Sequence, residues 1–173
     1  ADKAVGYCDL KGMPTARKAI CDYHKSKGIE DITDDDVYIG NGVSELVSMA
    51  LTALLNSGDE ILCPAPSYSL WTNSAYIAGG KPVLYTCDEK SDWFPDIADI
   101  KSKITSRTRA IVIINPNNPT GAIMDKDDLE KIAAILRDRQ IIVLSDEIYA
   151  ELTYGRRHVS IASLPGMWER TIV

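Results

Sequence analysis

Two short runs of apolar residues constrain the fold of this chain more than any other feature. Ala110–Ile114 and Ile141–Leu144 contain no polar side chain, and such runs are typical of parallel strands that are covered on both faces. Between them, Leu129, Ile132 and Leu136 recur at the spacing of an amphipathic helix. A strand, a helix and a second strand in this order predict a right-handed crossover within a parallel sheet.

The same alternation continues along most of the chain. The segment 44–55 is apolar on most faces, which is typical of a buried helix. Together the segments predict an α/β domain whose mainly parallel sheet has helices on both faces, in three layers. Further strands are expected at residues 37–39, 61–63, 83–85 and 171–173, and further helices between Pro14 and Gly28, at 69–78 and at 97–104.

The composition excludes several classes of protein. The chain has 173 residues, which matches one domain. Its net charge is −6 and it has no large cluster of lysine and arginine, which argues against nucleic-acid binding. Its apolar stretches end well before the roughly 20 residues of a membrane span, and no secretory leader is visible. We therefore expect a cytoplasmic protein that contacts neither nucleic acid nor a membrane.

The cysteines and histidines form no metal motif. No two cysteines have the spacing of a zinc site, and a chain with an ordinary core needs no disulfides, so we expect reduced thiols. His24 and His158 are far apart, and we expect both at the surface or in loops. The four cysteines are Cys8, Cys21, Cys63 and Cys87.

Polar segments follow the predicted strands where ligands bind in open α/β sheets, beyond the carboxyl ends. The segment Gly40–Ser44 leads into a helix, and a helix N-terminus favours a phosphate group. A tight turn capped by Ser44 explains the same residues, since they match no nucleotide-binding fingerprint. Tyr68 follows the strand at 61–63 and either stacks on a planar ligand or belongs to the core.

Two further segments follow the apolar strands. Asn115–Gly121 contains three asparagines and two prolines, a combination that a simple turn rarely requires. Asp146 and Glu147 come directly after Leu144 and Ser145. A carboxylate at the end of a buried strand is costly unless it is paired. Asp146 is therefore either part of a ligand site, a helix cap, or a member of a structural ion pair.

These segments together resemble the pyridoxal-phosphate enzymes of the class I/II aminotransferase family, of the aspartate-aminotransferase fold. The sequence Asn115-Pro-Asn-Asn-Pro-Thr-Gly121, followed by Ser145-Asp-Glu-Ile-Tyr149, carries the resemblance. Residues 37–122, which include Ser91-Asp-Trp-Phe-Pro95, are most similar to bacterial alanine aminotransferases, and residues 141–173 are as similar to bacterial aspartate aminotransferases. The resemblance implies the large domain of these enzymes, with a seven-stranded, mostly parallel sheet in which the strand near 37–39 pairs with one that follows the catalytic lysine.

The resemblance implies one set of contacts to the phosphate of pyridoxal 5'-phosphate. The backbone of Gly42, Val43 and Ser44 matches the segment that cradles the phosphate, and the Ser44 hydroxyl matches an assisting donor. Tyr7 matches a tyrosine that reaches the phosphate bound by the neighbouring subunit. That match implies a homodimer.

A second set of contacts is implied to the pyridine ring. Tyr68 matches the aromatic side chain that stacks on the ring, and Asn118 and Tyr149 match the groups that hydrogen-bond its hydroxyl. Asp146 matches the carboxylate that pairs with the ring nitrogen. An anionic partner keeps that nitrogen protonated, and the resulting pyridinium withdraws electrons from a substrate carbanion.

The Schiff-base lysine of the family is not found among these residues. It is expected in a Ser-Lys motif beyond Val173, and no lysine follows Lys131. Lys126 and Lys131 have acidic neighbours, and nothing marks either as an activated amine. We therefore expect residues 1–173 to be a partial cofactor-binding large domain, truncated before its last strands, without the small domain and inactive by itself.

Three hypotheses about function remain. The first is an aminotransferase that exchanges an amino group between an amino acid of the alanine or aspartate class and a 2-oxo acid. The second is another enzyme of the same fold, such as a β-lyase or a cyclopropane-forming synthase. The third is a non-catalytic domain that inherited the fold. A nucleotide-binding domain ranks last, because the glycine fingerprint is absent.

Overall fold

The computed structural model describes residues 6–173. The chain forms two compact units, Ala1–Leu46 and Val47–Val173, and each is described here by itself.

The described part of the first unit is built around helix α1, Pro14–Ser26. Pro14 occupies the first helical turn, where its missing N–H costs nothing. Gly28 follows the helix with a φ of 95°, a conformation that favours glycine. A short 3₁₀ helix, η1 at Asp34–Asp36, comes next, and Thr33 caps it by donating its backbone N–H and its hydroxyl to Asp36 Oδ2 at 2.8 and 2.7 Å.

The expected strand at residues 37–39 is wrong. These residues are described and form no strand. The Ile39 N–H donates to the Lys11 carbonyl at 2.9 Å, which is a single loop contact rather than a ladder. A short β-branched and aromatic run has strand propensity, but only a neighbouring strand turns propensity into a strand.

The second unit contains a six-stranded sheet in the order β3-β2-β1-β4-β5-β6. Only the pairing of β3 with β2 is antiparallel, and all the other pairings are parallel. The mainly parallel sheet is therefore confirmed, and within residues 6–173 it has six strands rather than the seven implied by the resemblance. The strands are β1 Glu60–Ala65, β2 Lys81–Asp88, β3 Phe94–Pro95, β4 Thr108–Ile114, β5 Ile142–Asp146 and β6 Thr171–Ile172.

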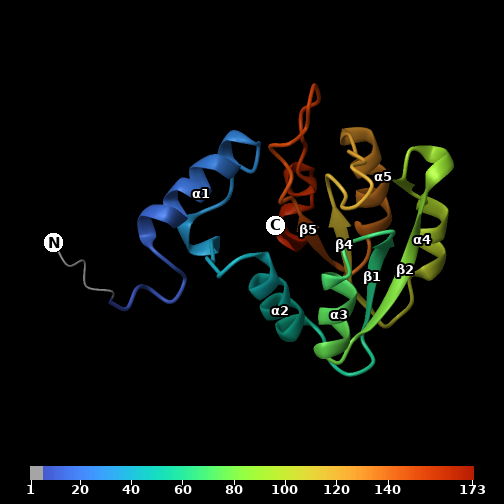
Figure 1. Ribbon diagram of the computed structural model, residues 1–173, viewed down its shortest axis with the longest axis horizontal. Coiled ribbons are helices and arrows are strands. Elements are labelled where there is room, and N and C mark those ends of the chain that lie inside the picture. Colours follow the sequence, from blue (N-terminus) through green and yellow to red (C-terminus); the bar gives the residue numbers. More distant parts are fainter. Residues whose placement is uncertain (1–5) are drawn as a thin grey trace. The chain divides into compact units, whose positions relative to one another are not determined.

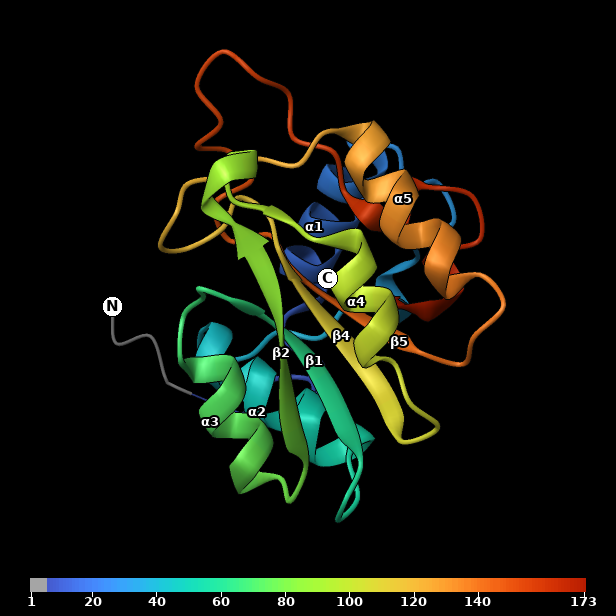
Figure 2. The same ribbon diagram turned by 90° about the vertical axis from the view of Figure 1, so that its right-hand side faces the viewer.

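Helices cover both faces of this sheet. Figures 1 and 2 show α3 (Leu70–Ile77) on one face and α4 (Ile97–Lys103) with α5 (Lys126–Leu136) on the other. Asp96 and Asp125 cap α4 and α5 through their side chains, as short polar residues at helix starts do. The predicted three-layer arrangement is confirmed.

The core lies along β4 and β5, as their composition predicts. Ile111, Ile113 and Val143 are fully buried. Ile114 lies opposite Asp146 in the parallel register of β4 and β5. The carboxyl ends of both strands are thereby held at the same level, and this fixes the residues that follow them. Two short 3₁₀ helices, η3 at Ile161–Ser163 and η4 at Trp168–Arg170, lead into β6.

Helix α2, Val43–Leu54, forms where a helix is expected but is not buried all round. Only Val47 and Leu51 are buried within it, and Met49 is 55% exposed. The prediction of a fully buried helix is therefore wrong for the described chain. Apolar side chains on every face of a helix become buried only where other elements pack against each face.

Candidate active site

Asp146 ends strand β5 and is held from two sides. Its backbone carbonyl accepts the Asn115 N–H at 3.0 Å, so the ends of β4 and β5 are joined. Its side-chain Oδ2 accepts the indole Nε1–H of Trp71 at 2.9 Å. Trp71 lies on α3 and is only 5% exposed. A buried donor from another layer of the fold therefore orients a half-buried carboxylate at the carboxyl edge of the sheet.

The segment Asn115–Gly121, called the asparagine loop below, is braced from within. Asn115 is 1% exposed, and its side chain both donates to the Met124 carbonyl at 3.3 Å and accepts the Met124 N–H at 3.0 Å. The Asn117 N–H donates to the Ala122 carbonyl at 2.9 Å, and its carbonyl accepts the Gly121 N–H at 2.8 Å. Two of the three asparagines thus hold the loop in shape.

The side chain of Asn117 extends this bracing to a second loop. Its Nδ2 donates to the Pro66 carbonyl at 3.2 Å and to the Thr120 hydroxyl at 3.1 Å. Pro66 lies in the segment that connects β1 to Tyr68. The loops that follow β1 and β4 are therefore fastened to each other, and Asn118 is the one asparagine of the three that stays half-buried rather than buried.

Asn118 and Tyr149 line one cavity of about 400 Å³. Its volume lies within the range of small-molecule sites, about 300–1,000 Å³. Leu152 and Tyr154 extend its lining, and both are largely exposed. The structure thus brings together the amide and the phenol that the sequence predicts to share a contact. Asp146 and Tyr68 do not line this cavity.

Tyr68 is 51% exposed and lies two residues before α3, so it is not a core tyrosine. Trp71 follows it three residues later, in the first turn of α3. The predicted stacking ring therefore lies close in sequence to the donor to Asp146. Sequence reasoning missed Trp71, because its partner lies 75 residues further along the chain.

Glu147 is the centre of a cluster that sequence reasoning also missed. Its Oε1 accepts the hydroxyls of Ser145 and Ser160 at 2.8 and 2.6 Å. Its Oε2 lies 3.8 Å from His158 Nε2, and both side chains are nearly buried. His158 lies in a loop, one of the two places expected for it, but its side chain is buried rather than at the surface. Only the acidic pair after an apolar strand signals this cluster in the sequence, since His158 and Ser160 come from a later loop.

The segment Gly40–Ser44, called the glycine loop below, belongs to the first unit. Gly42 has a φ of 84° and precedes the first residue of α2. A Cβ on Gly40 would lie 2.7 Å from Leu46 Cδ2, so a larger residue there would require the Leu46 side chain to shift. The first N–H groups of a helix have no partner within it and attract anions. Val43 and Ser44 lie in the first turn of α2, where the phosphate contact is predicted.

The loop closes on an acidic residue. The Asn41 N–H donates to Glu45 Oε2 at 2.5 Å, in the manner of a capping interaction. Tyr7, which belongs to the same unit, is fully exposed. Exposure of this side chain agrees with the predicted role toward a neighbouring subunit but does not test it.

An activated thiol or amine has a lowered pKa. In the described chain, the thiols and lysine amines with a shifted pKa are all shifted upward. Burial raises the pKa of Cys63 to about 12 and that of Cys87 to about 11. The hydrogen bond from Lys131 to Asp128 raises the pKa of that amine above its usual value. Lys126 lies 3.7 Å from Glu130 in an exposed pair. All four cysteines lie within the described residues and are free, as predicted.

Residues 6–173 contain neither a candidate metal site nor a candidate membrane span. No group of three or more histidine, cysteine or acidic side chains lies close enough together to hold a metal ion there. None of the helices in this part of the chain combines the length and the apolar character that crossing a membrane requires.

Comparison with known proteins identifies the family. The sequence model described as "Aminotransferase class I and II" matches residues 2–171. The chain belongs to this family. The chain is 56% identical over 162 residues to the glutamate-pyruvate aminotransferase AlaA of Escherichia coli K12. It is 50% identical over 163 residues to an alanine aminotransferase of Mycobacterium bovis. Each match covers 93% of this chain but only 40% and 38% of the relative.

Solved structures give the same result. An aminotransferase from Escherichia coli aligns with a TM-score of 0.90 at 56% identity, over 91% of this chain and 39% of the other. An aromatic aminotransferase from Pyrococcus horikoshii aligns with a TM-score of 0.93 at 36% identity, over 96% and 45%. The resemblance to alanine aminotransferases and the large-domain fold are confirmed. The chain spans about 40% of the length of the curated relatives that it matches.

Proposed function

We propose that this chain is the cofactor-binding portion of an enzyme that transfers an amino group between an amino acid of the alanine or aspartate class and a 2-oxo acid. The observation that carries the proposal is the placement of Asp146 at the carboxyl edge of a parallel sheet, with Trp71 donating to its Oδ2 at 2.9 Å. A carboxylate fixed at such an edge is suited to a cationic ring nitrogen.

The residues present fit pyridoxal 5'-phosphate in kind. Asn118 offers an amide and Tyr149 a phenol at one cavity, and both suit the ring hydroxyl. Tyr68 offers an exposed ring for stacking. When bound, this cofactor supplies an electron sink for the negative charge that develops on the substrate. In the first unit, the amides of Val43 and Ser44 at the start of α2 suit a phosphate dianion.

Each side chain would do a separate task. Asp146 would accept a hydrogen bond from the protonated ring nitrogen and so keep the proton on it. Trp71 would hold the carboxylate in one orientation. Asn118 and Tyr149 would donate to the ring oxygen and favour its anionic form. None of these groups replaces the lysine of the family, and the α5 lysines Lys126 and Lys131 pair with Glu130 and Asp128. We therefore propose that the isolated chain does not transaminate.

The activity is tested with the full-length protein. Alanine and aspartate are offered separately with 2-oxoglutarate, and transfer of the amino group is measured. A lyase of the same fold would instead release pyruvate without any 2-oxo acid acceptor. Absence of both reactions in a folded, cofactor-loaded protein would favour the non-catalytic domain.

The inactivity of the isolated chain has its own test. The chain is incubated with pyridoxal phosphate and reduced with borohydride, and the modified lysines are mapped by mass spectrometry. We expect slow labelling spread over several exposed lysines. A single dominant lysine, together with amino transfer above the rate of the free cofactor, would contradict the proposal.

We further propose that the full-length enzyme is a homodimer in which Tyr7 of each subunit serves the cofactor of the other. The test mixes a Tyr7→Phe enzyme with an Asp146→Ala enzyme under conditions that exchange subunits. If Tyr7 acts across the interface, each hybrid contains one intact site, and activity rises above that of either parent. If Tyr7 acts within its own subunit, mixing restores nothing.

A further inference from the structure

Two neighbouring residues of the second unit have a left-handed backbone. Asp92 and Trp93 have φ values of 53° and 63°. Side chains other than glycine rarely adopt this conformation, and two in succession are rarer still. Such strain persists where the surrounding structure enforces it and is concentrated at functional sites.

Hydrogen bonds before and after the two residues enforce this conformation. The Trp93 N–H donates to the Asp88 carbonyl at 2.8 Å. Asp88 also accepts the Lys90 N–H at 3.0 Å and so caps the 3₁₀ helix η2, Glu89–Ser91. Directly afterwards, Phe94 and Pro95 pair with β2 as strand β3. The chain is thus fastened on both sides of the two strained residues.

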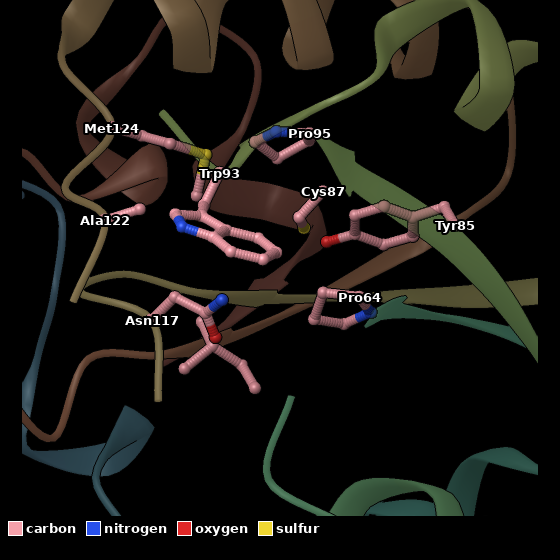
Figure 3. A pocket seen from close by; sticks show the side chains of 9 residues that line it. Pro64, Tyr85, Cys87, Trp93, Pro95, Asn117, Ala122 and Met124 are labelled. Carbon is pink, nitrogen blue, oxygen red and sulfur yellow. The ribbon is translucent and has the colours of Figure 1, made fainter. Parts of the chain in front are cut away.

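The result is the position of one side chain. Figure 3 shows the Trp93 indole between Met124 and Asn117, with Cys87 beside it. The space left among these side chains is about 10 Å³. This is at or below the smallest volume that holds a water molecule, about 10–15 Å³. The indole therefore fills the site closely.

The indole lines one small pocket together with the asparagine loop and the residues after it. Asn117 lies within the loop, Ala122 follows it directly, and Met124 lies two residues further on. Ala122 accepts the Asn117 N–H, and Met124 is bonded to the Asn115 side chain through both of its backbone groups. Trp93 thus packs against the residues whose hydrogen bonds set the shape of the loop, and Asn118 is the next residue after Asn117.

We propose that Trp93, held in a left-handed conformation, is a positioning residue that sets the direction in which the asparagine loop presents Asn118. The inference rests on the proposed function, in which Asn118 donates to the ring oxygen of the cofactor. It assigns a role to Ser91–Pro95, which the proposed contacts to the cofactor leave without one.

The experiment uses the full-length enzyme and compares Trp93→Ala and Trp93→Phe with Leu136→Ala. Leu136 is fully buried at the C-terminal end of α5 and lines neither the pocket of Trp93 nor that of Asn118. The control therefore loses thermal stability through the core alone. Phenylalanine keeps a ring in the cavity and serves as the conservative replacement.

The first readout needs no cofactor. In Trp93→Ala we expect the amides of Asn117 and Gly121 to exchange with solvent about tenfold faster than in wild type, because their loop opens more often. In Trp93→Phe these two amides should exchange at close to the wild-type rate. In Leu136→Ala their exchange should change no more than that of neighbouring amides. Unchanged exchange in Trp93→Ala would overturn the inference.

The second readout is the spectrum of the bound cofactor. Weaker donation from Asn118 disfavours the anionic ring oxygen, so the pH midpoint of the absorbance change should rise by about half a unit to one unit in Trp93→Ala. The control should keep the wild-type midpoint. A wild-type pH midpoint in Trp93→Ala would overturn this inference but leave the proposed function standing. If wild-type enzyme binds no cofactor, the proposed function fails and the inference fails with it.

Discussion

The asparagine loop and the glycine loop are both proposed to contact the cofactor, but they are built in opposite ways. In the asparagine loop, Asn115 and Asn117 bond to backbone groups of Met124, Ala122 and Pro66. In the glycine loop, the bond from the Asn41 N–H to Glu45 closes the turn, and the segment before it forms no strand.

The difference lies in what each loop is attached to. The asparagine loop follows β4, whose neighbours β1 and β5 are both present in the described sheet. Its shape is therefore set by residues of this chain. The glycine loop relies on local devices: a positive φ at Gly42, a close approach at Gly40 and an acidic cap. A loop that follows a paired strand is fixed by the sheet, whereas one that does not depends on its own turn.

The largest expected effect is on Asp146, the residue that the sheet holds most directly. In the full-length enzyme, Asp146→Ala should lower the rate of amino transfer by about 10²–10³-fold, the effect of removing one preorganised electrostatic contact. Circular dichroism and the melting temperature show whether the fold survives, and Asp138→Ala, at an exposed carboxylate, is the matched control. Turnover near the wild-type rate would remove Asp146 from the mechanism.

Asn115→Ala compares the two loops directly, because Asn41→Ala makes the same change in the glycine loop. The first substitution leaves both backbone groups of Met124 buried without a partner. We expect it to lower the free energy of unfolding by about 2–4 kcal/mol. Asn41 is exposed, and its replacement should change stability by about 0.5 kcal/mol or less. Urea denaturation measures both, and equal losses would contradict the contrast between the loops.

Trp71→Phe sharpens the comparison within the sheet. The ring stays in the core, but the hydrogen bond to Asp146 Oδ2 is lost. Hydrogen bonds to charged groups contribute about 1.5–3 kcal/mol. We expect about tenfold weaker binding of pyridoxal phosphate to the full-length apoenzyme, because the carboxylate is no longer oriented. Titration of the apoenzyme measures this affinity, and an affinity equal to that of wild type would show that the rest of the sheet edge orients Asp146 without Trp71.

The same contrast explains what the sequence predicts well. Ala110–Ile114 is buried on both faces, so its composition alone identifies a central strand. The residues that follow such strands could then be placed at one edge of the sheet. The segment 37–39 has similar local chemistry, but a strand requires a partner that local chemistry does not specify.

Contacts between residues far apart in the chain could not be predicted from the sequence for the same reason. Trp71 and Asp146 are 75 residues apart. His158 meets Glu147 through the return of a loop. The left-handed backbone at Asp92 and Trp93 could not be predicted either, because these residue types do not indicate that conformation as glycine does. The residue types that chemistry needs were predictable, and the groups that orient them were not.

The smallest expected effect tests the glycine loop through its cap. Glu45 supports the turn by accepting the Asn41 N–H at 2.5 Å, and its charge favours the N-terminus of α2. The same charge repels a phosphate group at that N-terminus. Glu45→Gln keeps an oxygen acceptor but removes the charge, so inorganic phosphate should bind about two- to fivefold more tightly to the full-length apoenzyme. Glu45→Ala loses the acceptor as well. Its affinity for phosphate should be lower than that of Glu45→Gln, because the loop is less ordered. The gain should shrink at high salt, since exposed charges are screened. Glu30→Gln, at an exposed acidic residue of the same unit, should leave the affinity unchanged. Phosphate affinity that is equal in Glu45→Gln and wild type at low salt would place the anion away from this helix end.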